Sequence, residues 1–244
     1  MSALVGAELL KLRLTRTAWV LLAVVVLLSG LRVTMVLASA GTASGIRAGT
    51  TDAALTLVGA AATGTVVAVF LGILSVTWEH QHQTLTGTLL GTPDRRRVVV
   101  AKAIALAAVG ALTGLGLSLA GACVAVVSGY AGGVGAGTWL SMVVGVTVSG
   151  AFWAWFGVGI GLVVRNQTAA LLVPLVWFLV VEPMVGAYGL QGLVPWLPGS
   201  LPGALVGANG PATPPVWAAL ATLIGYGLLL TVPGARRLTL QDVT

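Results

Sequence analysis

The sequence predicts an all-α integral membrane protein with six transmembrane helices. Hydrophobic residues make up 57% of the 244 residues and charged residues only 7%, whereas about 25% of the residues in a soluble domain are charged. The chain also contains six apolar runs of roughly 20 residues or more, the length that a helix needs to cross a bilayer core about 30 Å thick. These two observations exclude a soluble globular fold.

The apolar runs form one transmembrane domain that occupies residues 1–244. A barrel is excluded because its strands would alternate over about ten residues, and stretches such as AWVLLAVVVLLSGL do not alternate. The predicted spans are residues 17–39, 53–77, 101–128, 138–164, 168–187 and 214–233.

Basic residues gather in segments that an alternating path of six spans places on one side of the membrane. Such an excess marks the cytoplasmic side, so we expect both termini to lie in the cytoplasm. The segments contain Arg165, Arg236 and Arg237, together with seven candidate membrane anchors: Lys11, Arg13, Arg16, Arg95, Arg96, Arg97 and Lys102. Three arginines at a helix start oppose the helix dipole, so anionic headgroups or an acidic partner must compensate for them. Nucleic acid is excluded because no soluble basic face accompanies the arginines.

The loop after the second span reads WEHQHQTLTGTLLGTPD, from Trp78 to Asp94. Its first part lacks a helix breaker apart from Gly87, and a Gly-Thr-Pro-Asp turn follows, so we expect a short cytoplasmic helix. His80 and His82 would lie about 200° apart around that helix, unlike the i, i+4 pair of a helical zinc site. The chain has no third histidine, and we expect no metal site.

The N-terminal segment, residues 2–16, mixes leucines with Glu8, Lys11, Arg13 and Arg16. This amphipathic pattern predicts a helix in the headgroup plane, after which the chain turns into the membrane near Trp19. The alternative is a solvated N-terminus.

Two charged residues, Arg32 and Glu182, lie inside predicted spans. Each is about 14 residues from the cytoplasmic start of its span, which places both at a depth of roughly 21 Å. Intramembrane charges are usually functional or paired, so we hypothesise that the two side chains interact. The alternative is that Arg32 extends to the outer headgroups and Glu182 caps a polar vestibule.

Glycine and proline mark two further features. The pairs Gly110 with Gly114 and Gly157 with Gly161 have the spacing of closely packed transmembrane helices. Residues 190–210 are too apolar for a plain loop and too rich in proline and glycine for a span, so they predict short re-entrant or interfacial helices on the external side.

The motifs of several chemistries are missing from this sequence. It contains no phosphate-binding G-x-x-x-x-G-K-[ST] loop, and both histidines lie outside the predicted spans. We therefore expect no catalytic, cofactor-binding or metal-ligating residue in this chain.

Four stretches resemble the type-2 ATP-binding cassette (ABC) permeases, particularly the compact actinobacterial ones. They are AELLKLRLTRTAW at the start, E-x-x-x-x-T-L followed by P-x-x-R-R-x-x-x-A-K after the second span, V-R-N-Q after the fourth and V-V-E-P in the fifth. The resemblance implies that residues 2–16 form a connecting helix, that 79–90 form a coupling helix seated on an ATPase, and that 190–210 form external re-entrant helices. The implied coupling residues are Glu79, His80, His82, Thr84, Leu85, Thr88 and Leu89. His80-Gln81-His82-Gln83 departs from the aromatic, basic and glycine residues of related sequences.

The resemblance also implies partners. It predicts a second permease subunit, either identical or different, and two copies of a separate ATPase that binds ATP and Mg²⁺. Such a complex in the bacterial plasma membrane would export a drug, antibiotic, lipid or hydrophobic peptide. Two alternatives stay open, which are a stand-alone secondary transporter or channel, and a membrane enzyme or assembly scaffold.

Overall fold

The fold is taken from a computed structural model, which describes residues 1–40, 42, 47, 49–81, 95–164, 166–207 and 213–240. All regular elements within these residues are helices. Six segments are long and apolar enough to cross a membrane: Arg16–Ala38, Thr51–Glu79, Arg96–Val127, Ala136–Val164, Gln167–Ala187 and Val216–Arg237. The predicted all-α fold with six candidate spans is therefore confirmed.

The first span, α2 (Arg16–Ala38), follows the N-terminal helix α1 (Ser2–Leu14) through a single extended residue, Thr15. Two hydrogen bonds brace this bend. The Thr15 hydroxyl donates to the Lys11 carbonyl over 2.7 Å, and the Trp19 indole donates to the Arg13 carbonyl over 3.0 Å. The side chains of Thr15 and Trp19 thus bind backbone carbonyls in the last turn of α1 and support the bend.

The second span consists of α3 (Thr51–Ala62), a 3₁₀ segment η1 (Thr63–Val67) and α4 (Ala68–Gln81). The third is α6 (Arg95–Val127) and the fourth is α7 (Ala136–Val164). Helix α7 contacts α4, α6, α10 (Leu201–Val206) and α11 (Val216–Leu240). It is apolar around its whole circumference, as expected of a helix at the centre of a bundle, and its Trp153 is only 1% exposed.

Glycines allow the central helices to approach until their backbones touch. A Cβ atom at Gly110 would collide with the Gly150 carbonyl oxygen, and one at Gly114 would collide with that of Val146. On the other side of α7, a Cβ at Gly157 would collide with the Val69 carbonyl oxygen of α4. The close packing predicted from the glycine spacing is confirmed.

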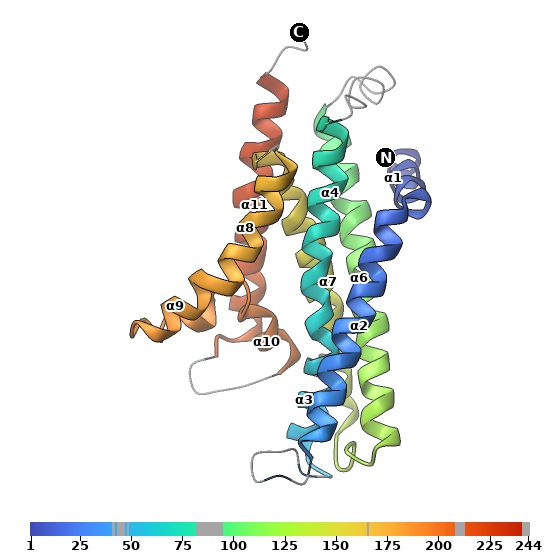
Figure 1. Ribbon diagram of the computed structural model, residues 1–244, viewed down its shortest axis with the longest axis vertical. Coiled ribbons are helices and arrows are strands. Elements are labelled where there is room, and N and C mark those ends of the chain that lie inside the picture. Colours follow the sequence, from blue (N-terminus) through green and yellow to red (C-terminus); the bar gives the residue numbers. More distant parts are fainter. Residues whose placement is uncertain are drawn as a thin grey trace.

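The fifth span is irregular and leans away from the bundle (Figure 1). It comprises α8 (Gln167–Val176), a wide π turn η2 (Trp177–Val181) and α9 (Glu182–Ala187). Pro183 cannot donate a backbone hydrogen bond, so the turn that precedes it loses one partner and widens. A short 3₁₀ turn, η3 (Val194–Trp196), and α10 follow. Leu201, Ala204 and Leu205 of α10 are buried.

Three helix ends with Lys or Arg residues, those of α1, α6 and α11, share one end of the molecule with the end of α4. Figure 1 shows α1, the last turns of α4, the first turns of α6 and the last turns of α11 at the same end. The predicted placement of this end in the cytoplasm stays a prediction, because the structure contains no membrane.

Candidate functional site

Four charged side chains meet where α1, α4 and α6 come together. Glu8 and Lys11 lie one turn apart on α1, Glu79 lies in the last turn of α4, and Lys102 lies on the second turn of α6. We refer to Glu8, Lys11, Glu79 and Lys102 as the junction cluster. Its two carboxylates and two ammonium groups give it no net charge.

Each ammonium group contacts both carboxylates. Lys11 Nζ lies 2.7 Å from Glu8 Oε1 and 2.9 Å from Glu79 Oε1. Lys102 Nζ lies 2.5 Å from Glu8 Oε2 and 3.1 Å from Glu79 Oε1. Lys102 also donates to the Ser75 carbonyl oxygen of α4 over 3.2 Å. Three helices are thus joined by charge-assisted hydrogen bonds, which are stronger than neutral ones.

Burial distinguishes the two lysines. The side chains of Glu8 and Lys102 are 7% and 6% exposed and that of Glu79 is 13% exposed, whereas Lys11 is 46% exposed. The prediction that Lys102 anchors the chain to headgroups is therefore wrong, because its ammonium group points inward to two carboxylates. Lys11 is also engaged with these carboxylates, although its side chain remains half-exposed.

The cluster holds the α1 side chains in their charged forms. Burial alone would raise the pKa of Glu8, but the ammonium groups of Lys102 and Lys11 outweigh it and hold this pKa below its ordinary value. Burial would lower the pKa of Lys11, but its hydrogen bonds to Glu8 and Glu79 raise it instead. Glu8 therefore stabilises the fold above about pH 4.3 and loses this effect in acid, while Lys11 contributes below about pH 10.4 and loses its effect in base.

The position of the cluster couples α1 to the loop between the second and third spans. Glu79 and Ser75 lie near the end of α4, just before this loop, and Lys102 lies just after the loop, on α6. Because Glu8 and Lys11 pair with residues on both sides, a displacement of the loop's two ends pulls on α1. Glu8 is the member that sequence reasoning missed. The sequence feature that could have revealed it is an acidic residue one turn before Lys11, in a helix whose other charged residues are basic.

The other predicted loop residues cannot be placed. The side chain of His80 and all atoms of His82, Thr84, Leu85, Thr88 and Leu89 lie outside the described residues, as does the side chain of Arg95. Arg13, Arg16, Arg96 and Arg97 are exposed. The predicted coupling role of the loop thus stays a prediction, and only Glu79 and the flanking helices are described.

The predicted pairing of Arg32 with Glu182 is wrong. Glu182 Oε1 accepts hydrogen bonds from Trp177 Nε1 and from the Gly199 backbone N–H, each over 2.8 Å. Arg32 is exposed on α2, and α9 leans away on the other side of the molecule (Figure 1). The sequence predicts similar depths for the two residues, but depth does not determine the angular position of a helix around a bundle. Glu182 instead ties α9 to the segment before α10.

The sequence model of the ABC-2 family transporter proteins matches residues 4–182, a range that contains all four members of the junction cluster. This chain belongs to the ABC-2 transporter family. No curated protein matches the sequence. Membership of the ABC-2 family, together with six membrane-spanning helices, identifies a multi-pass plasma-membrane protein with the role of an ABC permease.

Proposed function

We propose that this chain is the membrane subunit of an ABC exporter that moves a hydrophobic or amphipathic substrate outward. ATP bound with Mg²⁺ by two copies of a separate ATPase supplies the energy, and a second permease subunit completes the pathway. ABC-2 family membership is the single observation that carries this proposal. The absence of a phosphate-binding loop motif in the sequence agrees with an ATPase on another chain.

The junction cluster supports the proposal through its place in the chain. Residues 79–90 are the expected coupling helix, and Glu79 belongs to the cluster that ties the preceding and following spans to α1. A motor that moves this loop would therefore move α1, α4 and α6 together. The alternative of a stand-alone secondary transporter has no comparable support, because the family model that matches residues 4–182 describes ABC-2 transporters.

Co-purification tests the proposed partnership. The tagged full-length chain, expressed with the ABC ATPase encoded next to it, is expected to retain that ATPase through gel filtration. Leu85→Asp is expected to lose it, because a charge on the predicted apolar face of the coupling helix opposes docking. Leu27→Asn, a change on α2 far from the loop, should retain the ATPase. If the Leu85→Asp variant retained the ATPase, the proposed docking site would be contradicted. If the unaltered chain failed to retain the ATPase, the proposed function would be contradicted.

A further inference from the structure

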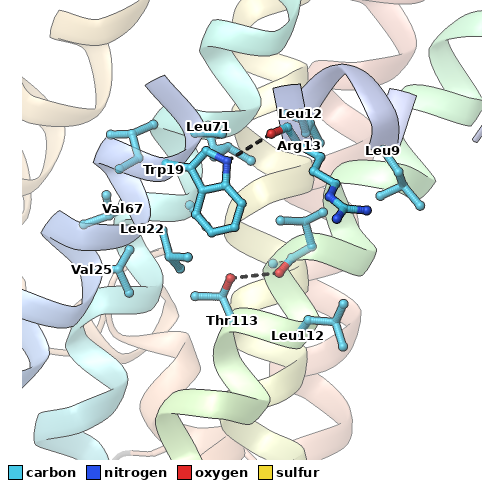
Figure 2. Close-up of a pocket in the computed structure, with 15 residues that line it drawn as sticks. Leu9, Leu12, Arg13, Trp19, Leu22, Val25, Val67, Leu71, Leu112 and Thr113 are labelled. Atoms are coloured by element: carbon cyan, nitrogen blue, oxygen red, sulfur yellow. Dashed lines mark hydrogen bonds between the residues drawn. The ribbon is translucent and has the colours of Figure 1, made fainter. Parts of the chain in front are cut away.

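A cavity lies beside the bend between α1 and α2, and none of the four junction-cluster residues lines it. Its volume is about 410 Å³, within the range of about 300 to 1,000 Å³ that small-molecule sites occupy. Its walls come from α1, α2, the second span and α6 (Figure 2). The ring of Trp19 and the side chains of Leu22, Leu71 and Leu112 form much of its surface.

The cavity opens to the outer surface of the bundle. Trp19 is 58% exposed, Leu22 is 39% exposed and Leu112 is 68% exposed. All three belong to helices that are long and apolar enough to span the membrane. A lipid of the surrounding bilayer can therefore reach this opening.

Arg13 is the one ionisable residue among those that line this cavity in the described part of the chain. In Figure 2 its side chain extends from α1 toward the wall formed by α6. The polar groups nearby already have partners, since the Trp19 indole donates to the Arg13 carbonyl and the Thr113 hydroxyl donates to the Val109 carbonyl. The guanidinium group is therefore the polar feature left to recognise a ligand, and it recognises anions with bidentate hydrogen bonds.

A second cavity of about 430 Å³ adjoins the first, because Leu12, Ala18, Leu21 and Leu71 line both. Its charged residues are the four members of the junction cluster, whose charges already neutralise one another. Of these two cavities, the one at Arg13 combines apolar walls with a positive charge that no carboxylate in its lining neutralises. That combination matches an amphiphile with an anionic head and a hydrocarbon chain.

We propose that the Arg13 cavity binds an anionic phospholipid from the leaflet that surrounds α1. The phosphodiester of the headgroup pairs with the Arg13 guanidinium, and part of one acyl chain fills the space between α2 and α6. The lipid holds α1 and the first span at a fixed angle. This binding does not depend on ATP or on the identity of the transported substrate.

Native mass spectrometry of the full-length chain in detergent, titrated with phosphatidylglycerol or phosphatidylcholine, tests this assignment. The unaltered chain is expected to bind phosphatidylglycerol about tenfold more tightly, because both lipids carry the phosphodiester but the quaternary ammonium group of phosphatidylcholine offsets its charge and repels the Arg13 guanidinium. Arg13→Gln removes that preference. Arg16→Gln is the matched control, because it loses the same charge two residues beyond α1 but does not line the cavity. Thr113→Phe fills the cavity and weakens the binding of both lipids.

Three results would overturn the assignment. Equal affinity for the two lipids would show that the cavity does not select a lipid with a net negative charge. If Arg13→Gln and Arg16→Gln reduced the preference for phosphatidylglycerol equally, the lipid would be held by a general electrostatic attraction to the basic surface of the protein. Displacement of phosphatidylglycerol by inorganic phosphate at the same concentration would show a simple anion site, without the acyl-chain contacts.

Discussion

Lys102→Met is expected to lower the free energy of unfolding by about 3 to 5 kcal/mol, the cost of removing one partner from a buried ion pair. The variant keeps the volume of the side chain but leaves the buried carboxylate of Glu8 facing one ammonium group, that of Lys11. Helix α1 should detach first, because the pair of Glu8 with Lys102 is a buried polar link between α1 and α6. Thermal unfolding in detergent measures the loss, and protease cleavage within residues 2–14 measures the release of α1.

The double variant Glu8→Leu with Lys102→Met is the control for this result. It removes both buried partners and leaves the pair of Lys11 with Glu79, so most of the lost stability should return. A single Lys102→Met variant as stable as the unaltered chain would contradict a buried cluster at this junction. A double variant less stable than the single one would contradict the pairing.

Gly110→Ala is expected to destabilise the bundle by about 2 to 3 kcal/mol, whereas Gly116→Ala on the same helix should stabilise it by up to about 1 kcal/mol. A methyl group at Gly110 collides with the backbone of Gly150, so α6 and α7 must move apart. Gly116 has no atom within 4 Å of the added carbon, and alanine favours the helix over glycine. Denaturation of the two variants in the same detergent compares them directly.

The opposite signs of these two effects are the critical feature. Overpacking alone predicts a loss at Gly110, and helix propensity alone predicts a gain at both positions. If both variants were more stable than the unaltered chain, α6 and α7 would not touch at Gly110 and Gly150. If both variants lost a comparable amount of stability, the face of α6 that carries Gly116 would be buried.

The fold followed from features that lie within single segments of sequence. Six apolar runs determine six spans because span length depends only on bilayer thickness, and glycine spacing predicts close packing because it depends only on the helical repeat. The junction cluster could not be predicted in this way. Its core is the pair of Glu8 with Lys102, which are 94 residues apart, and the pairing depends on how α1 is rotated against α6.

The same limit explains the two corrections. Lys102 resembles a headgroup anchor because it lies near three arginines, but a residue on the second turn of a helix faces the bundle or the lipid according to that helix's rotation. Arg32 and Glu182 have similar predicted depths, yet the wide turn before Pro183 carries α9 away from the bundle. Neither rotation nor tilt is encoded in the hydropathy of a single segment.

Transport by the reconstituted complex is the most direct test of the proposed export function. Proteoliposomes are prepared with the permease and its ATPase, with the permease alone, and with an ATPase whose catalytic carboxylate is removed. We expect outward substrate movement that requires ATP and the intact ATPase, and hydrolysis that rises when a transported compound is added. Substrate movement at an equal rate by the permease alone would contradict the account.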